Sequence, residues 1–111
     1  MIEKYLKDYL NDALSVPAYL ERPADCPDSF VIIERTGSLN REKIGGATIA
    51  IQSHAPSMYE TVCLNEEVLE AMEDAITVNE ITSCRLNTSY NFTNPNTKEY
   101  RYQAVFELTY Y

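Results

Sequence analysis

The sequence has little of what several large classes of protein need. Its 111 residues include no tryptophan, one histidine and three glycines, and no apolar run approaches the ~20 residues of a membrane-spanning helix. Charged side chains interrupt residues 1–12, so we expect neither a secretion signal nor a membrane partner. The length and composition predict one folded domain over residues 1–111.

Basic residues are also scarce, with 9 Lys and Arg against 17 Asp and Glu, which gives a net charge of −8. Binding to nucleic-acid phosphates needs a dense basic surface, so we expect no specific binding of DNA. Residues 44–84 hold seven acidic and no basic side chains. Within them, Glu66, Glu70 and Glu73 follow helical spacing and repel one another along one face. Two interpretations stay open, a solubilising face or a surface that faces a partner or a lumen.

The usual catalytic and ligand-binding motifs are missing. The sequence has no G-x-S-x-G nucleophile elbow, no glycine-rich phosphate loop and no close cysteine pair. His54 lies near Ser53 and Ser57, and an ordinary surface or loop histidine is the better interpretation than a triad. We therefore expect no catalytic residue, no cofactor and no metal, and a protein that is not an enzyme.

The three cysteines, Cys26, Cys63 and Cys84, are odd in number and widely spaced. This pattern argues against a disulfide framework and favours an origin in a reducing compartment. Structural zinc sites usually draw on close cysteine pairs, so buried thiols that fill the core are the better interpretation.

Hydrophobic periodicity predicts a sequence of seven elements. Apolar residues at helical spacing predict a helix over residues 2–14, which Pro17 ends before a short extended piece at 16–20. A β-branched strand at 29–35, a mobile hairpin loop at 36–46 and an antiparallel return strand at 47–53 come next. Ser57 and Glu60 have the spacing of a capping box and begin a long helix that runs to about Thr77. Strands at 81–90 and 100–110 flank a turn at 91–98.

These elements predict the α+β fold class, in the order α-β-β-β-α-β-β. Hairpins on either side of one long helix favour an antiparallel or mixed sheet of four to five strands, with two helices packed on one of its faces.

Two segments carry a family resemblance. The first reads PDSFVIIERTGS at residues 27–38, and the second reads ATIAIQSHAPS at 47–57 and runs into the long helix. They resemble the tail-terminator proteins, also called tail completion or head-tail joining proteins, of long-tailed bacteriophages and prophages. In that family a P-x-x-F-V-x-[VI]-E-R-T-G-G strand leads through a loop to a strand that ends in a W-A-x-[S/T] turn and caps a helix. Here Ser38 replaces the second glycine, and His54 stands where tryptophan is common.

The resemblance implies a structural role without catalysis or cofactor. Subunits of this family assemble into a ring, often of six copies, at the head-proximal end of the tail. The ring stops the polymerisation of the tail tube protein and provides the surface on which the head docks through its head-completion or connector protein. DNA passes through the ring without specific binding. The implied location is the virion, at the head-tail interface, after assembly in the host cytoplasm.

Two alternatives remain open at this point. One is another neck protein of the same virion, such as a head-completion stopper, which has a similar size and equally lacks catalytic motifs. The other is a small α+β ligand-binding or enzymatic domain, which an ordered pocket with a strongly perturbed histidine or cysteine would favour.

Charge segregation predicts which residues meet between copies in a ring. Arg35, Arg41 and Lys43 form the most concentrated basic group, whereas Glu66, Glu70 and Glu73 belong to the acidic interval. A ring is built from head-to-tail contacts, which bring unlike surfaces together. We therefore expect the basic group of one copy to meet the acidic group of the next.

Overall fold

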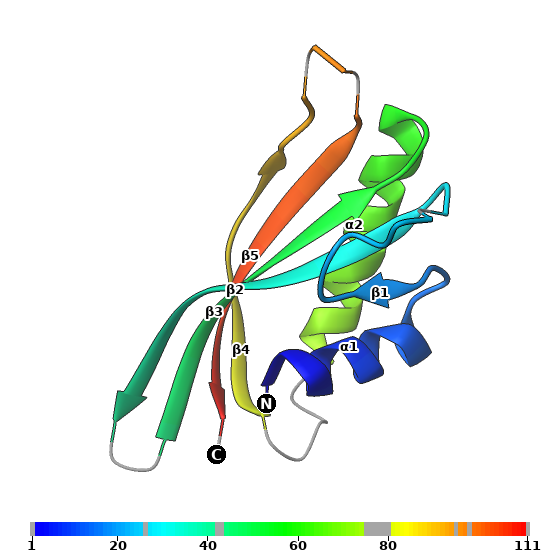
Figure 1. Cartoon of the computed structure of the whole chain (residues 1–111). Helices are drawn as coiled ribbons and strands as arrows, with labels where there is room; N and C mark the ends of the chain where they lie inside the picture. The colour runs from blue at the N-terminus through cyan, green and yellow to red at the C-terminus, as the bar shows by residue number, and fades with distance from the viewer. Residues whose placement is uncertain are drawn as a thin grey trace.

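The computed structural model describes residues 2–25, 27–41, 44–74, 81–94, 96–97 and 99–110 of the chain. They form two helices and five strands in the predicted α+β order, and this confirms the fold class (Figure 1). The elements are α1 (Ile2–Ala13), β1 (Ala18–Tyr19), β2 (Phe30–Arg41), β3 (Ile44–His54), α2 (Met58–Glu73), β4 (Ile81–Asn91) and β5 (Arg101–Tyr110).

The strands form one mixed sheet in the order β1-β2-β3-β5-β4. The two-residue β1 pairs parallel to β2 at Val31 and Ile32, and all other neighbours are antiparallel, as predicted for the first hairpin. Because a strand alternates its side chains between the two faces of the sheet, β3 and β5 each send every second residue to the helices. Ile49 and Ile51 of β3 and Phe106 and Leu108 of β5 are buried there.

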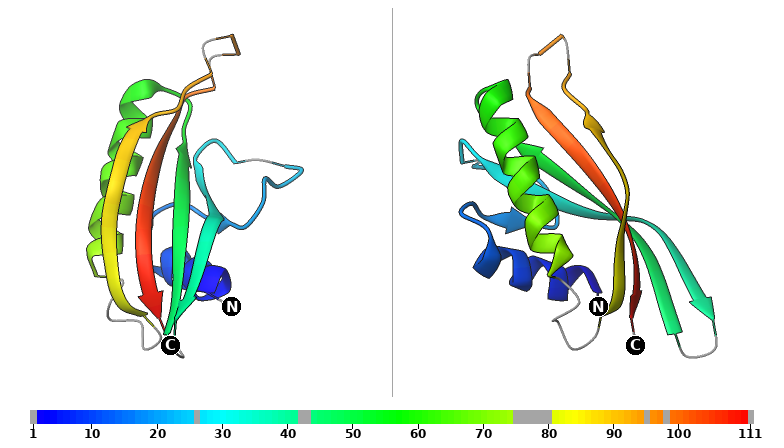
Figure 2. Two further views of the ribbon diagram at one scale, coloured as in Figure 1. Left: turned by 90° about the vertical axis from the view of Figure 1, so that its left-hand side faces the viewer. Right: turned by 180° about the vertical axis from the view of Figure 1, so that it is seen from behind.

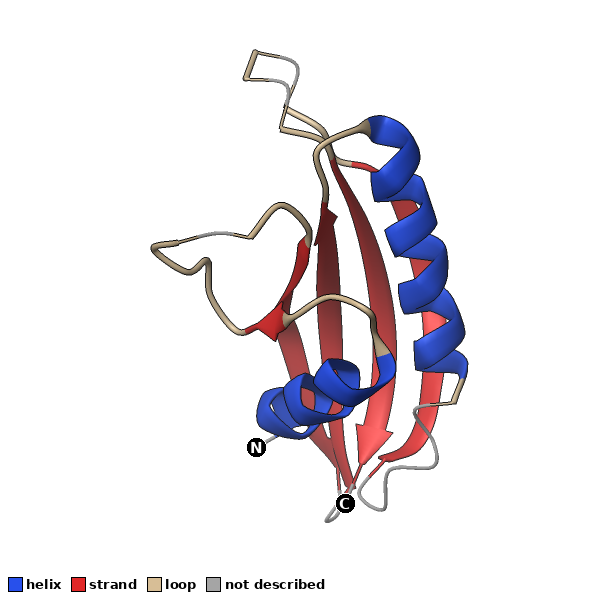
Figure 3. Cartoon of the chain, turned by 90° about the vertical axis from the view of Figure 1, so that its right-hand side faces the viewer, coloured by secondary structure: helices blue, strands red, loops and turns tan. Residues whose placement is uncertain are grey.

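Both helices pack on the same face of the sheet, as predicted (Figures 2 and 3). Leu6 and Leu10 of α1 join Val68 and Met72 of α2 and the inward strand residues in one apolar cluster. Two polar contacts connect α1 and the residues just after it to α2. The Tyr9 hydroxyl donates to the Ala71 carbonyl at 2.6 Å, and the Glu67 carboxylate accepts from the Ser15 backbone N–H and hydroxyl at 2.6 and 3.0 Å.

The two helices begin and end where local chemistry requires. α1 stops at Ala13, four residues before Pro17. The Asn11 side chain, in the last turn of α1, holds β1 in place. It accepts from the Ala18 N–H at 3.0 Å and donates to the Ala18 carbonyl at 3.2 Å. The predicted helix start is confirmed with Ser57 as its N-cap, since Ser57 Oγ accepts from the Glu60 N–H at 3.2 Å and donates to the Glu60 carboxylate at 3.0 Å. α2 ends at Glu73, and its predicted extension over 75–77 lies outside the described residues.

The predicted hairpin loop at 36–46 is wrong. β2 continues to Arg41 and β3 starts at Ile44, with pairs from Gly37 opposite Thr48 to Arg41 opposite Ile44. The polar composition suggested a loop. However, β3 is paired with β5 as far as Gly45, so β3 is already extended at these residues and β2 can form hydrogen bonds with it. A register shift between Arg35 and Gly37 accommodates the bend.

We call residues 37–48 the hairpin arm. Figure 1 shows the arm at the lower left, where it points away from α2, and its β3 strand is paired with β5 as far as Gly45. Gly45 is required by a close approach in this arm, because a Cβ atom there would lie 2.7 Å from the Tyr110 ring. Within the described residues, neither helix has the length and apolar character needed to cross a membrane.

Candidate functional site

The three basic residues expected at an interface all belong to the β2–β3 hairpin. Arg35 lies in β2 just before the register shift, and Arg41 is the last residue of that strand. Lys43 lies outside the described residues. Arg35 is already engaged within its own subunit, because its Nη2 lies 3.4 Å from Glu3 Oε2 of α1. Arg35 therefore ties the base of the hairpin to α1.

The three acidic residues lie together on the solvent side of α2. Glu66, Glu70 and Glu73 are exposed, and Tyr59, with 78% of its surface exposed, and Cys63 continue the same stripe toward the start of the helix. Glu67 does not belong to this stripe, because its carboxylate is bound to Ser15. The acidic stripe therefore stays available to a partner.

The basic arm and the acidic stripe lie on different sides of one subunit. The arm includes the end of β2, whereas the stripe is on α2, whose Glu73 lies beside β4 on the other side of the sheet (Figure 1). A single copy does not bring the two groups together, so their contact would have to join two copies. Whether copies meet in this way stays a prediction.

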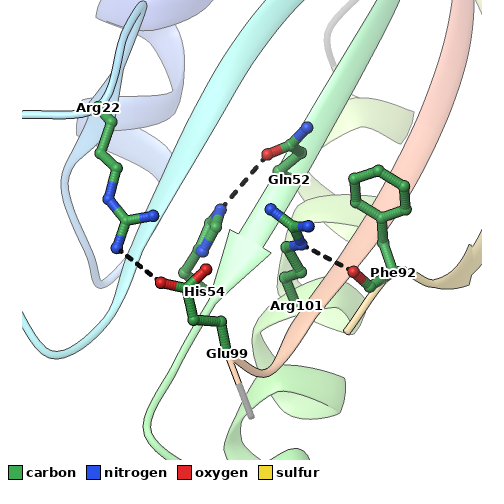
Figure 4. Close-up of polar contacts among 6 residues, drawn as sticks. All are labelled: Arg22, Gln52, His54, Phe92, Glu99 and Arg101. Carbon is green, nitrogen blue, oxygen red and sulfur yellow. Dashed lines mark hydrogen bonds and ion pairs between the residues drawn. The ribbon is translucent and has the colours of Figure 1, made fainter. Parts of the chain in front are cut away.

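The interpretation of His54 as a surface or loop histidine is wrong. His54 ends β3 and only 6% of its surface is exposed. Its ring stacks on Phe30 with centroids 4.6 Å apart, and its Nε2 lies 3.4 Å from Oε1 of Gln52 (Figure 4). The β2–β3 register sets this position, because Phe30 and His54 are directly paired. The sequence alone did not indicate that pairing.

The environment of His54 disfavours its charged form. Burial, together with the positive charges of Arg22 and Arg101, lowers the pKa of the imidazole from 6.5 to about 4, against the opposing effect of Glu99. Arg22 and Glu99 form an ion pair at 3.4 Å, and Figure 4 shows both beside the histidine. His54 is thus a neutral aromatic group at neutral pH.

A row of polar side chains crosses the sheet face opposite the helices, next to His54. Gln52 donates to Gln103 at 3.1 Å, and Gln103 donates in turn to the Tyr90 hydroxyl, so the row spans β3, β5 and β4. At the same end, the Arg101 guanidinium lies 4.5 Å from the centre of the Phe92 ring, and its Nε donates to the Phe92 carbonyl at 2.7 Å. Alternation in each strand indicated these residues singly, but only the register shows that they are neighbours.

Ser53, Ser57 and Asp74 could supply the other members of a triad with His54, but each has a different place in the fold. Ser53 is fully buried, and as the neighbour of His54 in a strand it faces the other side of the sheet. Ser57 caps α2, and Asp74 follows the last residue of that helix. The structure therefore does not bring these groups together as a triad.

The two described cysteines differ in their surroundings. Cys63 is exposed on α2, so the expectation of a buried thiol is wrong for this residue, because its position in the helix is on the acidic stripe. Cys84 packs against the core, and burial raises the pKa of its thiol to about 11. No group of three potential metal ligands occurs among the residues that were placed. Cys26 lies outside them.

No family model matches the chain, and no curated protein matches it. The assignment of a function therefore rests on the residues of this chain and on where the fold puts them.

Proposed function

We propose that this chain is a structural virion protein of a bacteriophage or prophage, which forms a ring at the head-proximal end of the tail. The observation that carries the proposal is the continuity of the two segments that resemble tail terminators. The first forms the start of β2 and enters the arm, and the second forms β3 and ends on the Ser57 cap of α2. They are paired strands of one hairpin, so the shared residues belong to one structural unit.

The distribution of charge supports this role. A ring requires two different surfaces on each subunit, which meet head to tail. The hairpin arm, which includes the end of β2, and the acidic stripe on α2, whose Glu73 lies beside β4 on the other side of the sheet, are such a pair. A net charge of −8 also suits a channel through which DNA must move without being held.

This role implies the partners of the chain and its location. The chain binds copies of itself in a ring, often of six, and the ring contacts the tail tube protein on one side and a head-completion or connector protein on the other. DNA passes through without specific binding. Assembly takes place in the host cytoplasm, and the finished ring remains in the virion at the head-tail interface.

The direct test is a polymerisation assay. The tail tube protein of the same virion is polymerised with and without the purified chain, and tube length is measured by negative-stain electron microscopy. We expect the chain to shorten the tubes in proportion to its concentration and to be seen as a ring at one end of each tube. Tubes of unchanged length with no terminal ring would contradict the proposal.

The same preparation separates this role from its nearest alternative. A head-completion stopper would bind isolated heads that lack tails and would leave tube length unchanged. Binding to DNA-filled heads is therefore measured in parallel by sedimentation. A terminator is expected to join heads only after it has capped a tube.

A further inference from the structure

The sheet has two free edges at the same end of the subunit. β4 is the last strand on one side, and on the other side β1 covers β2 only at Val31 and Ile32. Among the described residues, no strand pairs with the outer edge of β2 in the arm or with the outer edge of β4. Unpaired N–H and C=O groups on such edges are a template for another strand.

The two edges match in level and direction. Ser38 pairs with Ala47, Ala47 with Leu108, and Leu108 with Cys84, so residue 38 of β2 and residue 84 of β4 lie in one row across the sheet. The next row links Leu39 to Ser83 in the same way. Three antiparallel pairings separate β2 from β4, so these strands run in opposite directions. Copies placed side by side in one orientation would therefore join β4 to β2 as an antiparallel pair.

The edge of β4 lacks the residues that usually protect such strands. Its eleven residues contain no proline and no lysine, and Arg85 is the one charged residue. Proteins that stay monomeric commonly use proline, lysine, inward charges or β-bulges on an exposed edge, and of these β4 has only register shifts, between Ile81 and Ser83 and between Leu86 and Thr88. Leu86, with 46% of its surface exposed, lies on this strand and adds apolar surface beside the edge.

The surface beside β4 is also suited to binding the arm of another copy. A groove of about 130 Å³ runs between α2 and β4 and is lined by Leu69, Met72, Glu73, Cys84, Leu86 and Phe106. Glu73 of the acidic stripe is thus at the rim of an apolar groove, next to the free edge. The β2 strand of the arm, which would pair here, ends in Arg41, and Glu42 and Lys43 follow in the sequence, so two of these three charged residues are opposite in sign to Glu73.

We propose that the free edge of β4 in one copy pairs with residues 37–41 of the arm of the next copy, so that the sheets join into one continuous, closed sheet. The inference rests on the proposed ring and names its contact. Backbone hydrogen bonds supply the pairing, the groove beside α2 receives apolar surface, and the charges of arm and stripe set the register. Each copy uses one edge of each kind, so every contact around the ring is the same.

Cysteine cross-linking tests the pairing. In a background with Cys26→Ser and Cys63→Ser, one protein carries Ser83→Cys on β4, and a second carries a cysteine moved in turn through Ser38, Leu39 and Asn40. The two proteins are mixed, concentrated and oxidised. We expect at least one arm position to give a mixed disulfide dimer at about ten times the yield of the matched control, in which Asp8→Cys of α1 replaces the arm variant.

Hydrogen exchange on the wild-type chain provides a second measurement that needs no substitution. Between dilute and concentrated samples, we expect amide exchange to slow together in 37–41 and 81–86 while α1 stays unchanged. Slowing at 81–86 without the arm, or a disulfide between two Ser83→Cys chains, would show a symmetric β4 pair and overturn the inference.

The outcomes separate the pairing from the proposed function. Rings that form without protection or cross-linking at the two edges overturn the pairing and leave the proposed ring intact. Cross-linked copies that do not change tube length overturn the tail-terminator role and leave the pairing intact. A chain that stays monomeric at every concentration and on tube ends overturns both.

Discussion

The imidazole ring of His54 lies flat on the phenyl ring of Phe30, with an interplanar angle of 5° and centroids 4.6 Å apart. These residues are the last of β3 and the first of β2, paired across the open end of the first hairpin. The two rings lie at the end of the sheet where the chain leaves β3 and turns toward Ser57 and α2. Because the ring is buried beside arginines, the contact depends on the neutral form of the histidine.

His54 should make folding stability depend on pH. Its folded pKa of about 4 is below its usual value of 6.5, so as pH falls the unfolded chain takes up the proton first. The contribution is complete above pH 6.5, is lost progressively down to pH 4, and amounts to about 3 kcal/mol at most. Urea unfolding at several pH values should show this loss in wild type but not in His54→Phe, which keeps an aromatic ring on Phe30.

The difference between the two proteins is the quantity to compare, because both share every other titratable group. An imidazole pKa close to 6.5 by NMR would contradict the buried stack.

The Tyr9 hydroxyl should contribute to the packing of α1 on α2. It donates to the Ala71 carbonyl at 2.6 Å across the two helices. Tyr9→Phe removes this bond and should lower the free energy of unfolding by about 1 kcal/mol. Tyr5→Phe is the matched control, since Tyr5 is exposed on the same helix and should change stability by less than about 0.5 kcal/mol. Equal effects of the two substitutions in thermal unfolding would contradict this assignment.

Two adjacent glutamates on α2 should respond in opposite ways to loss of charge. Glu67 accepts two hydrogen bonds from Ser15, so Glu67→Gln should cost about 1 kcal/mol. Glu66 belongs to the exposed acidic stripe, where like charges repel, so Glu66→Gln should be neutral or stabilise slightly, by up to about 0.5 kcal/mol. Chemical unfolding at low salt measures both. A larger loss for Glu66→Gln than for Glu67→Gln would be the contrary result.

The sequence predicted the elements well where one local signal determined them. The Ser57 cap, the Pro17 stop and the alternation of β5 each depend on neighbouring residues, and the structure has all three. The arm was predicted as a loop because its composition is polar and includes Gly37, Gly45 and Gly46. Its strands form through pairing with β5, which is some sixty residues away in the chain, and no local pattern contains that partner.

In the candidate site, too, the features set by local sequence could be predicted and those set by distant pairing could not. The charges of the arm and the acidic stripe could be read from the sequence, since their spacing is local. The burial of His54, the row from Gln52 to Tyr90 and the groove beside β4 could not, because each depends on the register between strands distant in sequence.

Reversal of the arm charges should impair assembly without unfolding the subunit. Arg41→Glu with Lys43→Glu places acidic residues where the acidic stripe of the next copy is expected, so rings should fail to form and tail tubes should grow past their normal length. Lys4→Glu with Lys7→Glu is the matched control, because it changes the net charge equally on α1. We expect this control to form rings and to end tubes as the wild type does.

Opposite charges on the stripe should restore the arm variant. Glu70→Lys with Glu73→Lys, introduced into the same chain, would again give the arm and the stripe unlike charges, and ring formation should recover while far-ultraviolet circular dichroism stays unchanged in all four proteins. Loss of assembly in the α1 control would show that net charge is responsible, and normal tubes with the arm variant alone would show that arm and stripe do not meet. The combined variant returns to the wild-type net charge of −8, so its recovery indicates a contact between arm and stripe only together with normal assembly of the α1 control, which has the same net charge as the arm variant.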